Sequence, residues 1–354
     1  MTHQRIEHLD SLRVVAALAV VFGHSIGCFK GGKYGELIYS ITAHSAVVFF
    51  FLLSGFVLSR SLERNNALST VGIIGYGIRR LFRLYPMVLV TLLLGALVVL
   101  IIEVPLASSS SSEWFREQII HAKSVKTFSD YFNEILMRCQ FLNPPLWTIR
   151  AEFQCSIALP FLIIIQKKGK AYGIMLGICL AVYLLLDKGA HKSSFLLAFY
   201  LGHLVNVFSS NLGSITSNFT KFLLLILLPT WMMVASDWLM DTLILSLIFA
   251  LLVPCHWVGL KKILERPSLK FLGKTSFSLY AIHMPMLFLV WNWSMRFIEE
   301  IFPAIPVGIS EIFIFVLTVS VTLPLAAITE RFVERPWNDW GHLLSNCYTQ
   351  KFAT

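Results

Sequence analysis

Two ionisable side chains lie on the first hydrophobic segment of the chain, LRVVAALAVVFGHSIGCF. Arg13 and His24 are eleven residues apart, close to three helical turns, so both point to one face of a helix. Their separation along the axis is roughly 16 Å, which predicts Arg13 near the membrane surface and His24 near the middle of the bilayer. Ionisable groups at that depth are costly and usually functional. The alternative is a neutral histidine hydrogen-bonded inside a helix bundle.

A basic cluster, YGIRRLFRLYP, comes just before the third hydrophobic segment. Arg79 and Arg83 are four residues apart and share a helix face, with Arg80 beside them. The planar fork of arginine suits phosphate recognition. Simple anchoring of the segment at the cytoplasmic membrane surface is the competing interpretation.

The segment PPLWTIRAEFQCS places Arg150 and Glu152 inside the fourth hydrophobic segment. A glutamate in a membrane span must face the bundle interior or a cavity and find a partner. Glu152 enters from the membrane face opposite to Arg13, so we expect it to reach the depth of His24. An ion pair that only joins two helices is the alternative.

The segment GKTSFSLYAIHMPML carries Ser276, Tyr280 and His283 in another hydrophobic stretch. Pro285 is expected to kink this helix and to free backbone carbonyls, as is common at membrane sites. Tyr280 is also compatible with a packing role.

The second hydrophobic segment, FFFLLSGFVLS, contains a milder polar signal. Ser54 and Gly55 are small residues of the kind that let membrane helices approach closely. We therefore expect packing rather than chemistry from this pair.

Composition identifies the class of protein. The 354 residues are 56% hydrophobic and only 14% charged, with a mean hydropathy of +0.71, whereas soluble domains carry about 25% charged residues. We predict an all-α, polytopic membrane helix bundle of about ten transmembrane helices. The expected spans are 12–30, 44–62, 84–103, 146–166, 170–187, 193–209, 219–236, 240–259, 275–296 and 305–329.

The distribution of basic residues predicts the orientation. With alternating spans, most of the 29 lysines and arginines fall on one side, which the positive-inside rule assigns to the cytoplasm together with both termini. This topology accounts for much of the net charge of +9, which therefore implies no nucleic-acid partner, although the arginines also suit anionic lipid headgroups. The first segment does not read as a cleaved signal peptide.

The remaining segments indicate no further chemistry. The six cysteines show no metal-ligand spacing, so we predict neither a metal site nor disulfides. The longest extramembrane segment, about 104–145, is expected on the periplasmic side. We assign 1–340 to the membrane domain and 341–354 to a short cytoplasmic tail.

Six motifs in register resemble the integral-membrane acyltransferase family three, whose members modify bacterial surface glycans. LDSLRVVAALAVVFGH resembles its Arg-x10-His signature, HSAVVFFFLLSGF its FFxLSGF motif and YGIRRLFRLYP its RRxxRxxP element. LWTIRAE is similar to WSLxxE, LGKTSFSLYAIHMP to SYSLYLxHxP, and ERFVERPW to a closing E-R-P. The match covers nearly the whole chain.

Some positions depart from the family pattern. Thr148 stands where serine is frequent, which keeps a hydroxyl, and Val48 replaces an acid before the FFxLSGF motif. Cys155 and Ser156 replace an aromatic pair, which leaves the acceptor pocket unassigned. The chain ends soon after the last span, so we expect no fused periplasmic esterase-like domain.

The resemblance implies transfer of an acyl group, usually acetyl, from cytoplasmic acetyl-CoA or another acyl-CoA to a sugar hydroxyl. His24 is then the general base or a transient acyl carrier, oriented by Glu152, with Arg150 or a backbone amide stabilising the oxyanion. The phosphates of the donor would be held by four arginines, Arg13, Arg79, Arg80 and Arg83. Positioning or proton transfer falls to His283, Tyr280, Ser276 and Thr148.

The resemblance further implies a multi-pass protein of the bacterial inner membrane whose acceptor is a surface polysaccharide or a lipid-linked glycan. The rival interpretation from another class is a transporter or flippase of a lipid-linked sugar, because buried Arg, His and Glu also form transport sites. The inverted repeats typical of transporters are not evident. A third interpretation keeps acyl transfer but changes the acceptor to a lipid or a small molecule.

Overall fold

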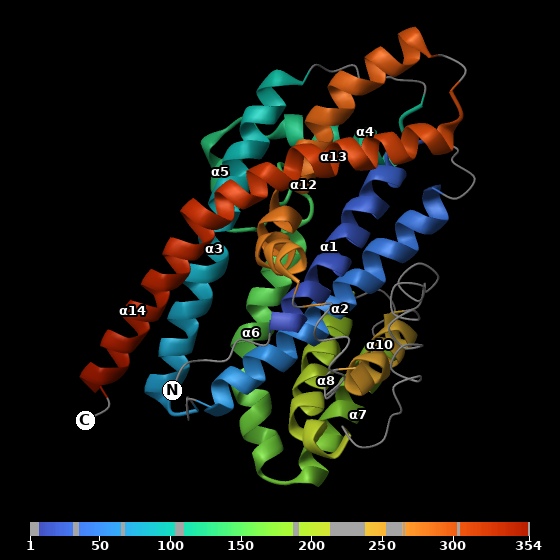
Figure 1. Ribbon diagram of the computed structural model, residues 1–354. Coiled ribbons are helices and arrows are strands. Elements are labelled where there is room, and N and C mark those ends of the chain that lie inside the picture. Colours follow the sequence, from blue (N-terminus) through green and yellow to red (C-terminus); the bar gives the residue numbers. More distant parts are fainter. Residues whose placement is uncertain are drawn as a thin grey trace.

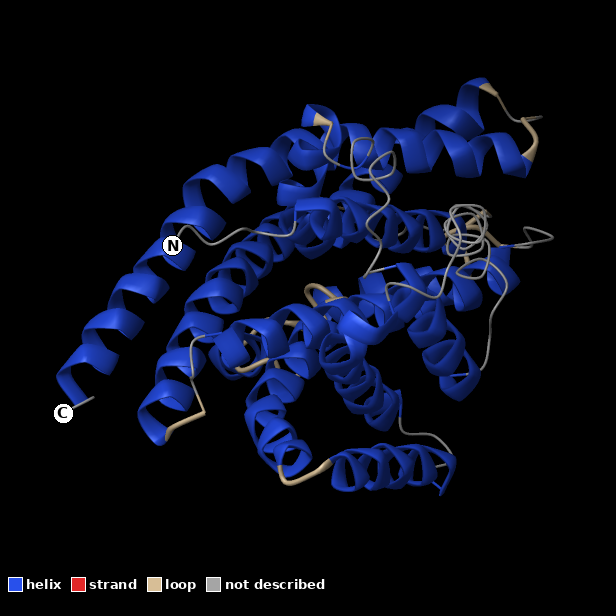
Figure 2. Cartoon of the chain, turned by 60° about the horizontal axis from the view of Figure 1, so that its bottom comes forward, coloured by secondary structure: helices blue, strands red, loops and turns tan. Residues whose placement is uncertain are grey.

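The computed structural model describes residues 7–30, 35–64, 68–102, 110–186, 191–212, 238–252, 264, 266–302 and 305–352. These residues are almost entirely helical and contain no β-strand, apart from an isolated bridge between Phe29 and Ser111 (Figure 2). The prediction of an all-helical membrane protein is confirmed. The helices are α1 Glu7–Gly27, α2 Gly35–Arg64, α3 Thr70–Ile101, α4 Glu113–Ser124, α5 Phe128–Ile135, α6 Leu146–Lys167, α7 Lys170–Leu186, α8 His191–Leu212, α10 Trp238–Leu252, α12 Pro267–Ile301, α13 Val307–Thr329 and α14 Arg335–Phe352, with a π-helical turn, η1 Glu330–Glu334, before α14.

Capping residues fix where several helices begin. The Ser69 hydroxyl accepts the Gly72 N–H at the start of α3, and the Ser112 hydroxyl accepts the Phe115 N–H at the start of α4. Such caps satisfy backbone donors that have no partner inside the helix. α12 begins instead with Pro267, whose missing N–H costs nothing in the first turn.

Five helical stretches are long and apolar enough to cross a membrane. They are Leu9–Gly27, His44–Glu63, Thr70–Ile101, Leu146–Lys167 and Val307–Phe352. The predicted spans 170–187 and 193–209 correspond to the helices α7 and α8, which contain shorter apolar stretches. The predicted span 219–236 lies outside the described residues, and 240–259 is described only to residue 252. The number of about ten spans stays a prediction.

The third span differs from its prediction in where it begins. We placed its start at residue 84, after the arginine cluster, but α3 starts at Thr70 and contains all three arginines. Arg80 is only 5% exposed, so it is covered by the neighbouring helices of the bundle. Residues 341–352, expected as a short tail, belong to α14, which runs along α3 (Figure 1).

Glycines let two helices pack almost backbone to backbone. A Cβ on Gly55 of α2 would lie 2.0 Å from the Phe199 carbonyl oxygen of α8, and a Cβ on Gly202 would lie 2.1 Å from that of Leu52. Any larger residue would force the helices apart. The packing role predicted for Gly55 is confirmed.

The bundle has two distinguishable ends. At one end, a Cβ on Gly273 of α12 would lie 2.7 Å from the backbone of Asp10 in the first turns of α1. At the other, the bridge between Phe29 and Ser111 ties the end of α1 to the residues before α4. α4 and α5 thus gather at the second end (Figure 1), the end at which α1 finishes.

Candidate active site

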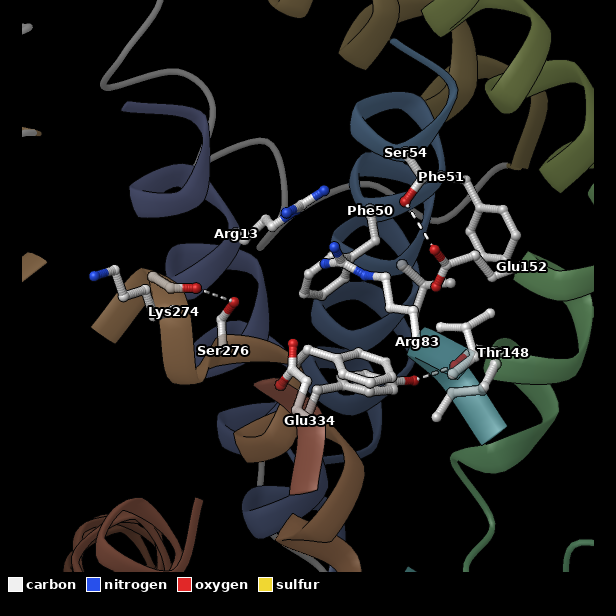
Figure 3. A pocket seen from close by; sticks show the side chains of 16 residues that line it. Arg13, Phe50, Phe51, Ser54, Arg83, Thr148, Glu152, Lys274, Ser276 and Glu334 are labelled. Carbon is white, nitrogen blue, oxygen red and sulfur yellow. Dashed lines mark hydrogen bonds between the residues drawn. The ribbon is translucent and has the colours of Figure 1, made fainter. Parts of the chain in front are cut away.

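A cavity opens among α1, α2, α3, α6, α12 and η1. It holds about 720 Å³ of space, including the open solvent at its mouth. Figure 3 shows the side chains that line it, which come from segments far apart in the sequence. They are Arg13, Val47, Phe50, Phe51, Ser54, Arg83, Leu84, Thr148, Ile149, Glu152, Gly273, Lys274, Ser276, Phe277, Tyr280 and Glu334.

One wall of the cavity contains a buried ion pair. Arg80 Nη2 donates to Glu152 Oε1 at 2.6 Å, and Arg80 Nε donates to the Ser156 hydroxyl at 3.1 Å. The Ser54 hydroxyl donates to the same Glu152 oxygen at 3.2 Å. Buried charges need this degree of satisfaction to be tolerated. Glu152 is therefore the counter-ion of Arg80.

Further cations line the same cavity. Arg13 Nη1 pairs with Asp10 Oδ1 at 3.0 Å, and Figure 3 shows Arg13 and Arg83 extending into the cavity. Neither Arg83 nor the exposed Lys274 makes a hydrogen bond with the described residues. Two cations are therefore available to an anionic ligand, facing one further carboxylate, that of Glu334.

A histidine pair lies at the other end of α1. His24 Nδ1 and His283 Nε2 are 2.9 Å apart, and His283 Nδ1 is 2.5 Å from the Tyr280 carbonyl oxygen. A carbonyl only accepts, so His283 Nδ1 carries the proton and its Nε2 accepts from His24 Nδ1–H. The lone pair of a neutral His24 is then on Nε2, the atom that can take a proton from a substrate.

Tyr280 connects the cavity to the histidine pair. Its hydroxyl lies 2.7 Å from the Thr148 hydroxyl at the cavity wall, and its ring centroid is 5.6 Å from that of His283. The cavity lining includes Tyr280 and Thr148 but neither histidine. Tyr280 is thus the side chain shared by the two parts of the site.

Pro285 fixes the backbone beside His283. Proline has no N–H, so the carbonyl of Ala281, four residues earlier, loses its helical partner. Asn143, which precedes α6, donates its Nδ2 proton to that carbonyl at 2.7 Å. The prediction that Pro285 frees a carbonyl at this site is confirmed. Asn143 donates the hydrogen bond that this carbonyl would otherwise lack.

A family profile described as an acyltransferase domain matches residues 6–331. The chain belongs to the acyltransferase 3 family. A Staphylococcus aureus (strain COL) protein, provisionally named an O-acetyltransferase, is 24% identical over 388 residues, which cover 95% of this chain and 58% of the relative. A Shigella phage Sf6 protein named O-acetyl transferase is 26% identical over 176 residues, 47% of this chain and 49% of the phage protein. The matched regions thus cover only about half the length of each of these relatives, and no solved structure matches the chain.

In this acyltransferase 3 member the first-helix pair spans the two parts of the site. Arg13 lines the cavity, and His24 lies in the last turn of α1, stacked on Trp114 of α4 with ring centroids 5.8 Å apart. His24 therefore lies nearer one end of the bundle than the eleven-residue spacing predicts. The carboxylate of Glu152, expected to orient His24, instead binds Arg80, and His283 is the group that holds the imidazole.

The arginine cluster divides between two surfaces. Arg80 and Arg83, three residues apart, face the cavity side, whereas Arg79 Nη1 donates to the Ser345 hydroxyl of α14. Arg79 thus points toward α14 rather than into the cavity that Arg83 lines, and the predicted role of the arginines in holding the donor stays a prediction.

Two other predicted residues are held by backbone carbonyls. Arg150 Nη1 donates to the Met137 carbonyl at 3.0 Å and does not line the cavity. The Ser276 hydroxyl lines the cavity and donates to the Gly273 carbonyl at 2.7 Å. The structure thus gives Arg150 a partner in the loop after α5 rather than a place beside His24.

Sequence reasoning missed three polar residues that line the cavity. Ser54 was assigned to packing, and Lys274 and Glu334 were not singled out. Glu334 ends the π-helical turn η1 and accepts from the Ser278 hydroxyl at 2.9 Å. π-Turns are rare and frequent at functional sites. The motif ERFVERPW was the available signal for Glu334.

Proposed function

We propose that this protein is a membrane O-acyltransferase that moves an acetyl or other short acyl group from acyl-CoA to a sugar hydroxyl of a surface polysaccharide or lipid-linked glycan. The observation that supports this best is the junction at Tyr280. It joins a cavity whose Arg83 and Lys274 make no hydrogen bond with the described residues to a histidine pair whose outer imidazole can act as a base. Neither the cavity without a base nor the histidine pair without a donor site would be sufficient for acyl transfer.

The cavity suits the donor. Coenzyme A carries several phosphate charges, which Arg83, Lys274 and Arg13 would bind at the mouth. With both termini in the cytoplasm of a multi-pass inner-membrane protein, this mouth faces the cytoplasm, where acyl-CoA is made. The acyl end then points inward toward Tyr280 and Thr148.

The histidine pair suits the chemical step. The sugar hydroxyl gives its proton to His24 Nε2 while its oxygen attacks the thioester carbonyl carbon. The tetrahedral intermediate collapses with cleavage of the carbon–sulfur bond, and the leaving thiolate takes the proton from the His24 imidazolium. His283 holds the ring through Nδ1 during both transfers, as a carboxylate does in other base arrangements.

The test follows radiolabel from [14C]acetyl-CoA in purified wild-type and His24→Ala protein. Loss of a general base lowers the rate roughly 10²- to 10⁴-fold, so His24→Ala should transfer almost no label to glycan and hydrolyse almost no acetyl-CoA. Trp340→Ala, on the exposed side of α14, is the matched control and should retain both activities. A wild-type protein that neither hydrolyses nor transfers the acetyl group would instead support a transporter.

A further inference from the structure

α4 is an ordered helix whose first residues are hydrogen-bonded to the end of α1. Lys30 N–H donates to the Ser110 carbonyl at 2.7 Å, and Ser112 N–H donates to the Cys28 carbonyl at 2.7 Å. The Ser112 hydroxyl also donates to the Gly27 carbonyl at 2.6 Å. These bonds fix the first turn of α4 relative to the last turn of α1, which contains His24.

The buried face of α4 reinforces this position. Phe115, Ile119 and Ala122 are buried in a cluster with Trp291 and Phe288 of α12. The ring centroids of Phe115 and Trp291 are 4.9 Å apart. α4 is thus a rigid part of the bundle rather than a surface loop, and it can hold a ligand in a defined place.

The adjoining face of α4 brings an indole beside the base. The Trp114 and His24 rings are nearly parallel, with 5° between their planes and 5.8 Å between centroids. Both side chains are half-buried, whereas His283 is fully buried. Within this described cluster, the solvent-accessible surface therefore belongs to His24 and Trp114 and not to His283.

Polar side chains accompany Trp114 on the same face. Glu117 and Gln118 follow it by three and four residues, so they lie one helical turn along. Glu117 is exposed and Gln118 half-buried. Apart from His121, α4 carries two acidic residues and two cationic ones, Arg116 and Lys123, so it lacks the cationic surplus that a phosphate ligand would favour. No residue of α4 belongs to the described lining of the cavity.

We propose that this face of α4, Trp114 with Glu117 and Gln118, is the binding platform for the pyranose ring of the acceptor. A pyranose has an apolar C–H face that packs on an indole, and hydroxyls at its rim that bond to carboxylate and amide groups. A ring seated there presents a hydroxyl to His24 from the side opposite the donor cavity. This assignment rests on the proposed acyl transfer to a sugar.

Binding is measured by saturation-transfer NMR with the methyl glycosides of glucose, galactose and rhamnose on the full-length protein in detergent. We expect wild-type protein to saturate the ring C–H protons of at least one glycoside. Trp114→Ala should weaken its binding roughly 10- to 30-fold, the range for removal of a central aromatic anchor. Trp114→Phe should retain most of it, and Trp340→Ala should bind as wild type.

The outcomes separate this platform from the catalytic proposal. No glycoside binding by the wild type, or equal binding by Trp114→Ala, overturns the platform. If Trp114→Ala lowers the unfolding temperature, Gln118→Ala and Glu117→Ala replace it, and unchanged binding in both overturns the platform. Binding that depends on Trp114, in a wild-type protein that transfers no acetyl group, keeps the platform and overturns the acyltransferase proposal.

Discussion

The two ends of the site satisfy their buried polar groups in different ways. The cavity end uses ions: Arg80 is matched by Glu152 and Arg13 by Asp10. The histidine end uses hydrogen bonds between uncharged groups and backbone carbonyls, with His283 on Tyr280 and Asn143 on Ala281. The first arrangement holds charge, and the second holds a proton donor and acceptor in a fixed direction.

This difference would suit two tasks within the proposed reaction. A polyanionic donor needs a site whose cations are already held in place, because their desolvation is costly when a ligand must bring the only counter-charge. A base needs an imidazole in a defined tautomer, which a carbonyl enforces without adding charge. Tyr280 belongs to both ends, and its hydroxyl meets that of Thr148 at the cavity wall.

Breaking the ion pair at the cavity end should have the largest effect. Glu152→Ala leaves the guanidinium of Arg80, which is only 5% exposed, without its counter-ion. Loss of one partner of a buried pair costs about 3–5 kcal/mol, so the unfolding midpoint in detergent should fall sharply. Glu113→Ala, which removes an exposed carboxylate from α4, is the matched control and should leave the midpoint unchanged.

A double variant separates the charge from the packing. Glu152→Leu with Arg80→Met removes both charges together, and such apolar replacements are often neutral in stability. The unfolding midpoint of the double variant should therefore return toward that of wild type. A Glu152→Ala protein as stable as wild type would contradict the role assigned to this pair.

The motifs predicted which helices meet, but not which side chains pair. Local sequence identifies Arg13, His24, Glu152 and His283 as buried ionisable groups, because lipid solvation makes each of them conspicuous. Pairing depends on the depth at which each helix crosses its neighbour. A shift of one turn, 5.4 Å along a helix axis, decides whether Glu152 meets His24 or Arg80.

The sequence also could not predict which face of a helix is covered by a segment far along the chain. Arg79 and Arg83 are equivalent by helical spacing, and only the packing of α14 along α3 distinguishes them. The predicted start of the third span, residue 84, was also wrong. Apolar windows end at charged residues even where the helix continues through them, as α3 does. Pro285 was predicted correctly because its effect on the Ala281 carbonyl is local to its own helix, and Gly55 because a missing Cβ permits close packing whichever helix is the neighbour.

Arg79 and Arg83 therefore form a matched pair for the donor site. Arg83→Ala removes a cavity cation and should raise the KM for acetyl-CoA roughly 10- to 100-fold, the value of a charged hydrogen bond. Arg79→Ala removes the same charge from the same helix but on the α14 side, and the KM should stay near that of wild type. Steady-state kinetics of both variants at equal ionic strength give the comparison.

Equal changes in the two variants would mean that the cluster acts only through its total charge. Such a result would support membrane anchoring and would remove the distinction between the cavity side and the α14 side of α3. A salt titration sharpens the contrast, because screening weakens exposed charges more than partly buried ones.

The smallest effect is expected at the histidine end, where no charge is lost. Asn143→Leu leaves the Ala281 carbonyl without a donor, because Pro285 cannot supply one. An orphaned buried carbonyl costs about 1–3 kcal/mol. Pro285→Ala restores an N–H four residues after Ala281, so the helix itself can satisfy the carbonyl and the cost of Asn143→Leu should shrink in that background.

The double-mutant cycle measures this coupling directly in the free energy of unfolding. Strictly additive effects of Asn143→Leu and Pro285→Ala would show that the amide serves some other group. A stable double variant with reduced kcat would be the more informative result. It would show that the carbonyl needs only a donor, whereas catalysis needs Pro285 itself in the helix that presents His283 to His24.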